Sequence, residues 1–404
     1  MEFYTYTLPN GIRGIHRQVR STVAHCALII GAGSRDEHPG QYGLAHLTEH
    51  AFFKGTERRR AWQVNCRLEN LGGELNAFTT KEETTIHATT LRGDFAKAAE
   101  LIADIAFRST FPEREIEREK EVIADEINTY KDSPAEMLYD TFEDMLFEGS
   151  ELGHNILGRK AALMRYDGDA IRAFTARTHT TDRMVFSSIG NFSPKTAEAT
   201  ALRYFGEQAA TTRGFERAAP PAVKPFEKTV TKHTHQTHCI IGNRACGIEE
   251  TKRLPLALLV NVLGGPSANS LLNVEVREKH GLSYNIEANY IPYGDSGLVA
   301  IYFSSEHTNE AQCAELVERQ LQRLRTTPLT GRQLSMAKKQ FIAQLAISGE
   351  SNENYMLSAG KSLLTHDEID TMEEVYAKIG ALTAAQLTEA AEEVFTKMSR
   401  LTYK

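Results

Sequence analysis

Two histidines and a glutamate that fall within five positions of one another are the residues best suited to chemistry. His46, Glu49 and His50 lie in residues 43–53, a stretch with no proline, no internal glycine and apolar residues at helical spacing. This pattern predicts a helix. One turn separates the two imidazoles, so they can share a metal ion, and Glu49 falls in the same arc, where it can take a proton from water. His-x-x-Glu-His is the mirror-ordered form of the His-Glu-x-x-His zinc motif.

The pattern also has an ordinary interpretation. The chain has 14 histidines in 404 residues, and two of them on a partly apolar helix can be plain surface or core residues. A second helix bearing carboxylates favours the metal interpretation. Residues 113–131 predict a long charged helix preceded by proline, and Glu119 and Glu126 share one of its faces because they are seven positions apart.

Glu126 has two interpretations at this point. It can be a solvated charge, like most glutamates on such a helix, or it can be the third ligand of a metal site. Catalytic zinc sites typically have three protein ligands, two histidines and a glutamate being one known set, with water in the fourth position. A metal site on the first helix therefore requires a carboxylate from elsewhere in the chain.

Strands and helices alternate around these two helices. In the first half, strand patterns and turn signals predict a hairpin over 3–9 and 12–19, strands at 25–31, 74–80, 84–91 and 183–190, and helices at 62–71, 94–109, 169–177 and 194–205. The second half predicts strands at 229–242, 283–290 and 297–304, and helices at 254–263, 271–279, 309–325 and 332–348. No helix is predicted between 132 and 149.

The length and one shift in composition predict two domains. A chain of 404 residues exceeds what one core usually holds. Alanine, threonine and proline become frequent after residue 206, which is typical of a semi-extended linker. We therefore predict a first domain at 1–208, which contains the candidate metal ligands, a linker at 209–228 and a second domain at 229–404.

A faint internal repeat relates the two halves. The run His238-Cys239-Ile240-Ile241-Gly242 echoes the run from His25 to Gly31, and a predicted helix at 254–263 follows it where the histidine helix follows the first copy. That second helix has neither His nor Glu, so we expect the second half to bind no metal.

Composition excludes several classes of partner. The formal net charge of −7 argues against nucleic acid or an anionic membrane as a partner, and no apolar run is long enough to span a bilayer. Five scattered cysteines without a Cys-x-x-Cys pair are typical of a reducing compartment. Residues 1–7 alternate like a strand and lack a signal-peptide pattern. We therefore expect a cytoplasmic protein.

The motifs resemble those of one family. Gly-Leu-Ala-His46-Leu-Thr-Glu49-His50-Ala-Phe-Phe-Lys-Gly-Thr, followed later by Glu126, resembles the M16 metallopeptidases, the inverzincins that include pitrilysin, insulin-degrading enzyme and the β subunit of mitochondrial processing peptidase. The resemblance continues through Gly-Gly-Glu-Leu-Asn-Ala-Phe-Thr at 72–79 and resumes at Gly264-Gly265 and at Arg-Glu-Lys-His-Gly-Leu-Ser-Tyr, residues 277–284. It covers nearly the whole chain, and the length is that of the short bacterial members, whose two-domain chains associate in pairs.

The resemblance implies a role for each matching residue. His46, His50 and Glu126 would be the ligands of one Zn²⁺ per chain, Glu49 the general base that activates the attacking water, and Glu119 a supporting carboxylate behind the ligands. A peptide would lie as an added strand on the edge formed by Asn76, Ala77 and Phe78.

Two residues of the second half match the family as well. Arg277 and Tyr284 would hold the substrate carbonyl from the other side of the cavity, with Tyr284 as an oxyanion donor. Without the motif around them, an arginine at a helix end followed by a strand tyrosine is better explained by packing.

The family also implies fold and assembly. We expect the α+β class, with two topologically similar domains, each an antiparallel sheet with helices packed on one face. Two chains would form a hollow clamshell that admits unfolded peptides, as a homodimer or as an M16 heterodimer, and as a hypothesis Arg277 and Tyr284 would serve the partner subunit's zinc. A non-catalytic assembly or scaffold subunit is the alternative, and the intact motif argues against it.

Overall fold

The computed structural model describes residues 2–222, 224–248 and 250–404 and divides them into two compact units. Three residues lie outside this range: Met1 in the predicted first domain, Val223 in the predicted linker and Glu249 in the predicted second domain. The first unit comprises residues 1–128, 154–218 and 347–371, and the second comprises 129–153, 219–346 and 372–404. Each unit is thus centred on one predicted half and takes a short segment from the other half.

A six-stranded sheet forms the centre of the first unit, in the order β1-β2-β6-β3-β5-β4. Its strands are β1 (Tyr4–Thr7), β2 (Arg13–Gln18), β3 (Val23–Ile30), β4 (Glu74–Thr79), β5 (Thr84–Leu91) and β6 (Met184–Gly190). All neighbouring strands are antiparallel except β2 and β6, which are parallel. Among the described residues, β4 pairs only with β5, so one of its edges is free of strand partners.

Helices cover one face of this sheet because alternate residues of the strands are apolar on that side. Leu28 and Ile30 of β3 are completely buried in a core shared with these helices. The helices of the first unit are α1 (Leu44–Phe52), α2 (Ala61–Glu69), α3 (Phe95–Arg108), α4 (Glu113–Lys131, through residue 128), α6 (Lys160–Leu163), α7 (Gly168–Thr178), α8 (Pro194–Phe205) and α12 (Asn352–His366).

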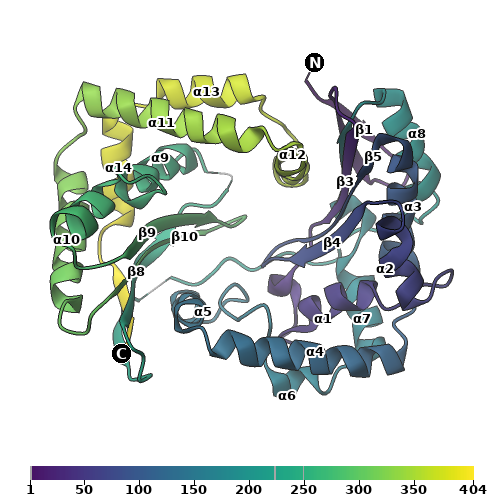
Figure 1. The fold of residues 1–404 in the computed structure, drawn as a ribbon, viewed down its shortest axis with the longest axis horizontal. Helices are drawn as coiled ribbons and strands as arrows, with labels where there is room; N and C mark the ends of the chain where they lie inside the picture. The colour runs from purple at the N-terminus through teal and green to yellow at the C-terminus, as the bar shows by residue number, and fades with distance from the viewer. Residues whose placement is uncertain (1, 223, 249) are drawn as a thin grey trace. The chain divides into compact units, whose positions relative to one another are not determined.

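The second unit is built around a five-stranded sheet in the order β7-β11-β8-β10-β9. Its strands are β7 (Glu227–Val230), β8 (Thr237–Ala245), β9 (Asn285–Pro292), β10 (Gly297–Ser305) and β11 (Ser399–Tyr403). Its helices are α5 (Pro134–Leu146), α9 (Arg253–Gly264), a π-helical turn (Asn273–Lys279), α10 (Glu310–Thr326), α11 (Gly331–Gly349, through residue 346), α13 (Met372–Ala381) and α14 (Ala384–Val394). Figure 1 shows both sheets with their helices.

The two sheets repeat one topology, which confirms the internal repeat. The order β2-β6-β3-β5-β4 corresponds strand by strand to β7-β11-β8-β10-β9, including the one parallel pair in each sheet. The predicted α+β class with two similar domains is therefore confirmed.

Each sheet also receives one helix on its other face, and that helix comes from the opposite half of the sequence. α12 packs on β6 and β3 of the first sheet, where Gly360 approaches Ile29. α5 packs on β8 and β11 of the second sheet, with Phe142 at the centre of a separate apolar cluster. We predicted helices on one face of each sheet, whereas the structure has helices on both faces. The described helices include none with both the length and the apolar character needed to cross a membrane.

Candidate metal centre

Helix α1 positions the two histidines. Gly43 precedes it with φ 92°, a left-handed conformation that favours glycine, and the buried side chains Leu44, Leu47 and Ala51 anchor the helix to the core. The helix therefore presents its remaining face away from the core. The imidazoles of His46 and His50 lie on that face, with their ring centroids 4.6 Å apart.

Glu126 on α4 completes a three-residue cluster. One of its carboxylate oxygens, Oε2, lies 3.7 Å from Nε2 of His46 and 3.7 Å from Nε2 of His50. All three potential ligand atoms lie within 4.8 Å of one another, and no other group of three such residues within this distance occurs in the described part of the chain. Ligands about 2.0–2.2 Å from a tetrahedral zinc ion would lie roughly 3.3–3.5 Å from each other. The cluster therefore fits a metal ion with little movement.

His46 is held in its neutral form. Burial, with the nearby His50 adding to it, lowers the pKa of His46 to about 3, so its ring keeps a lone pair for a metal at neutral pH. The ring makes no hydrogen bond to the described residues, and its Nδ1 is buried. The nitrogen that faces the other two candidate ligands is Nε2, which lies 3.7 Å from Oε2 of Glu126.

Glu119 orients the second histidine. Its Oε1 lies 2.7 Å from Nδ1 of His50, and Nζ of Lys54 lies 2.5 Å from its other oxygen. Burial alone would raise the pKa of Glu119, but hydrogen bonds from His50 and Lys54 and their charges hold it below its usual value. When Nδ1 of His50 donates its proton to this carboxylate and the ring is neutral, Nε2 would be left to bind a metal ion.

Glu49 lies on the same helix outside the ligand cluster. Burial raises the pKa of its carboxyl group and the charge of Glu126 adds to this effect, whereas the neighbouring Thr79 and His50 oppose it. A carboxylate with a raised pKa beside a metal site is suited to accept and return a proton. Thr79 is the last residue of β4, so Glu49 lies near the end of the edge strand.

The residues predicted to receive a peptide form this edge. Asn76, Ala77 and Phe78 are consecutive residues of β4, and Oδ1 of Asn76 accepts a hydrogen bond of 2.9 Å from the backbone N–H of Ala77. The side chain of Ala77 is buried and that of Asn76 is exposed. A free strand edge beside α1 is the arrangement that a peptide binding as an added strand needs.

Arg277 and Tyr284 lie in the second unit. Arg277 belongs to the π-helical turn, and Tyr284, which is 87% exposed, directly precedes β9. Both line a pocket of about 260 Å³ whose other walls include Gly264 and Gly265. The structure brings these two residues together, as the motif suggested, on a unit that carries no ligand cluster within its described residues.

Two functional neighbours escaped the sequence analysis. Lys54 fixes Glu119, and Thr79 contacts Glu49. Lys54 could have been found, because it lies four residues after His50, one helical turn further along, although α1 itself ends at Phe52. Thr79 had no such signal, since its role depends on how β4 meets α1.

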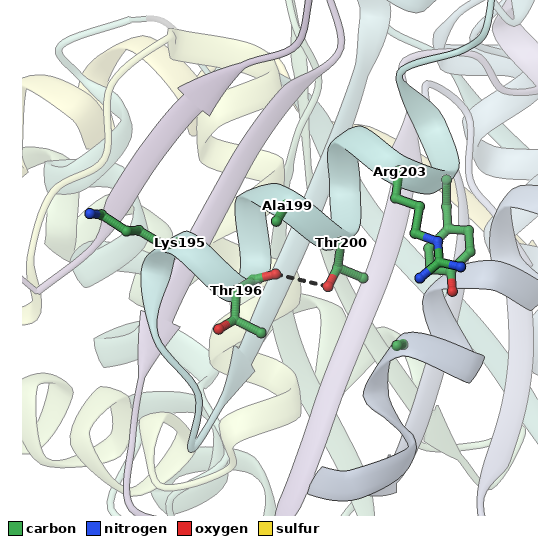
Figure 2. Close-up of a pocket in the computed structure, with 7 residues that line it drawn as sticks. Lys195, Thr196, Ala199, Thr200 and Arg203 are labelled. Atoms are coloured by element: carbon green, nitrogen blue, oxygen red, sulfur yellow. Dashed lines mark hydrogen bonds between the residues drawn. The ribbon is translucent and has the colours of Figure 1, made fainter.

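A second hollow, of about 400 Å³, lies between α8 and α3 (Figure 2). It is lined partly by Lys195 and Arg203, which lie at opposite ends of the α8 segment drawn, and it contains none of the residues predicted to act in catalysis.

Comparisons with known proteins identify the family of the chain. The family model described as insulinase, peptidase family M16, matches residues 15–160, and the model described as the peptidase M16 inactive domain matches residues 166–341. An uncharacterised zinc protease of Bacillus subtilis, YmxG, is 32% identical over 396 residues, covering 97% of this chain and 95% of its own length. An uncharacterised zinc protease of Rickettsia bellii is 29% identical and covers 91% and 89%.

Solved structures show the same fold. A protease from Helicobacter pylori superposes with a TM-score of 0.91 at 20% identity, covering 100% of this chain and 99% of that one. A structure described as the peptidase M16 inactive domain, from Pseudomonas fluorescens, gives 0.92 at 20% identity, with 100% and 98% covered.

Proposed function

Because the chain belongs to the insulinase family of M16 peptidases, we propose that it is a zinc-dependent endopeptidase that hydrolyses unfolded peptides and holds one zinc ion per chain. The observation that carries the proposal is the convergence of His46, His50 and Glu126 on one point, beside a carboxylate on the same helix. Two histidines and one glutamate, with water in the fourth position, are a known ligand set of catalytic zinc sites.

The protein's own groups account for the remaining steps. When bound, zinc supplies Lewis acidity at the scissile carbonyl. The carboxylate of Glu49 takes a proton from the attacking water and returns it to the leaving amine. Glu119 keeps the tautomer of His50 fixed through Nδ1. The free edge of β4 receives the peptide backbone as an added strand, so the site would select peptides by their extended conformation in preference to their sequence.

Replacing Glu49 with glutamine tests the function. Glutamine keeps the size of the side chain but cannot accept the proton, so we expect turnover to fall by roughly 10²-fold or more, with one metal ion still bound per chain. The measurement is metal content alongside cleavage of a mixed pool of unstructured peptides, with and without a chelator. Near-normal cleavage by the variant would refute the role of Glu49, and a wild-type protein that binds no metal would favour the scaffold alternative.

We also propose that two chains pair, so that Arg277 and Tyr284 of one chain serve the zinc site of the other. The exposure of Tyr284, and its place in the unit whose described residues hold no ligand cluster, support this arrangement. Mixing inactive Glu49→Gln chains with inactive Tyr284→Phe chains should restore part of the activity, because some mixed dimers then contain one intact site. No recovery despite proven exchange of chains would exclude shared sites.

A further inference from the structure

A buried carboxylate holds the beginning of the metal-ligating helix. The side chain of Glu37 is completely buried. Its Oε1 accepts a hydrogen bond of 2.7 Å from the N–H of Ala45, and its Oε2 accepts bonds of 3.1 Å from the N–H of Gly43 and 2.8 Å from Nε2 of His154. Burial raises the pKa of Glu37, and these three donors oppose the rise by favouring the charged form.

These contacts satisfy groups that a helix cannot satisfy itself. The first N–H groups of a helix have no partner within it, and the helix dipole places partial positive charge there. Glu37 supplies both a partner and a negative charge, directly before the ligand His46. The same junction is sterically tight, since a Cβ atom on Gly43 would lie 2.7 Å from the carbonyl oxygen of Leu157.

The contacts continue to the turn that ends the edge strand. Nζ of Lys81 donates a hydrogen bond of 2.5 Å to the carbonyl oxygen of His154. The carbonyl oxygen of Lys81 accepts one of 2.7 Å from the N–H of Arg35, two residues before Glu37. Lys81 lies in the turn between β4 and β5. Glu37, His154, Lys81 and Arg35 therefore form a closed ring of contacts, which we call the positioning ring.

We propose that Glu37, His154 and Lys81 are positioning residues that fix helix α1 against the edge strand β4. The inference rests on the proposed function, because it assumes that β4 holds the peptide and that α1 carries the metal. No side chain of the ring ligates the metal in the proposed site. Their effect would be to set the distance between a peptide carbonyl on β4 and the metal site, and an error of about 1 Å in such a distance can cost roughly 10²-fold in rate.

Single substitutions that open the ring are the first test. Lys81→Met removes the ammonium group, and His154→Leu removes the donor to Glu37. For each variant we expect kcat to fall by about 10-fold or more, with KM within about 2-fold of wild type and one metal ion still bound per chain. Lys195→Met is the matched control, because Lys195 is an exposed lysine on α8 far along the chain from the ring (Figure 2).

A double variant and a conservative variant separate positioning from general stability. Because either substitution opens the same ring, the double variant should lose little more kcat than each single one. His154→Gln should recover most of the loss, since its amide nitrogen lies about where Nε2 of the imidazole does. Losses that multiply in the double variant, or unchanged kcat in both fully folded single variants, would overturn the inference.

Hydrogen exchange tests the ring without using activity. In the metal-free protein, opening the ring should speed exchange in both the first turn of α1 and in β4, while β8 of the second unit stays unchanged. Faster exchange in α1 alone, or in neither segment, would contradict the ring. If the wild-type protein cleaves no peptide, the proposed function fails, and this exchange result still decides whether the ring couples the two elements.

Discussion

The two units share a strand order and a helix arrangement, yet only one has a ligand cluster among the described residues. In the first unit, α1 follows β3 and packs against α7. In the second, α9 follows β8 and packs against α14 in the same way. Helix α9 is apolar along most of its length, with Leu256, Leu259 and Leu263 buried. At the equivalent place in the first unit, helix α1 has His46, Glu49 and His50 in addition to its buried apolar residues.

The difference extends to the second helix of the site. α4 contributes Glu119 and Glu126, whereas α11, which follows α10 as α4 follows α3, has no Asp or Glu in its sequence and no buried residue. The repeated fold therefore does not itself create the chemistry. It creates a place where one helix packs beside an edge strand, α1 beside β4 and α9 beside β9, and a few polar residues there and on a second helix decide whether that place can hold a metal.

The substitution with the largest expected effect tests this contrast between the two units directly. His50→Ala removes one ligand, so we expect the metal content to fall from one ion per chain to none and peptide cleavage to be lost, because the described residues of the second unit offer no replacement set. Metal content after dialysis, measured by atomic absorption, checks the first expectation. The matched control is His238→Ala in β8, whose Nδ1 lies 2.8 Å from the hydroxyl of Tyr302 and which should keep its metal and activity. A metal ion retained by the His50→Ala protein would place the site elsewhere.

Much of the first unit could be predicted from local sequence patterns. The helix predicted at 113–131 has these bounds in the structure, and the strands predicted at 74–80 and 84–91 correspond to β4 and β5. The spacing of His46 and His50 also fixed their shared face correctly. These predictions succeeded because periodicity and turn residues act over short distances along the chain.

Two features of the structure could not be predicted from local sequence patterns. The exchange of α5 and α12 between the halves depends on which sheet a helix covers, and an apolar stripe on a helix does not specify its partner. α5 itself was missed, although Ser133-Pro134 before Leu138, Phe142 and Leu146 is a helix-start signal followed by apolar residues four positions apart. The roles of Glu37 and His154 could not be predicted either, because the two residues are 117 positions apart and meet only in the folded chain.

The exchanged helices offer a smaller and more local test of the comparison. Phe142 of α5 is completely buried against the second sheet, and Phe142→Ala should cost about 3–5 kcal/mol of unfolding free energy through lost burial and a cavity.

On the first sheet, a Cβ atom at Gly360 of α12 would lie 2.5 Å from Cδ1 of Ile29. Gly360→Val should therefore cost about 1–3 kcal/mol through overpacking.

Hydrogen exchange resolved by strand shows where each cost falls. Phe142→Ala should speed exchange in β8 and β11, and Gly360→Val should speed it in β3 and β6. If each variant loosens only its own sheet, the exchanged helices are part of the core of the unit that they cover, and the sequence halves are not the folding units. If each variant loosens both sheets equally, the two units unfold together, and the second unit, whose described residues hold no ligand cluster, then stabilises the unit that holds one.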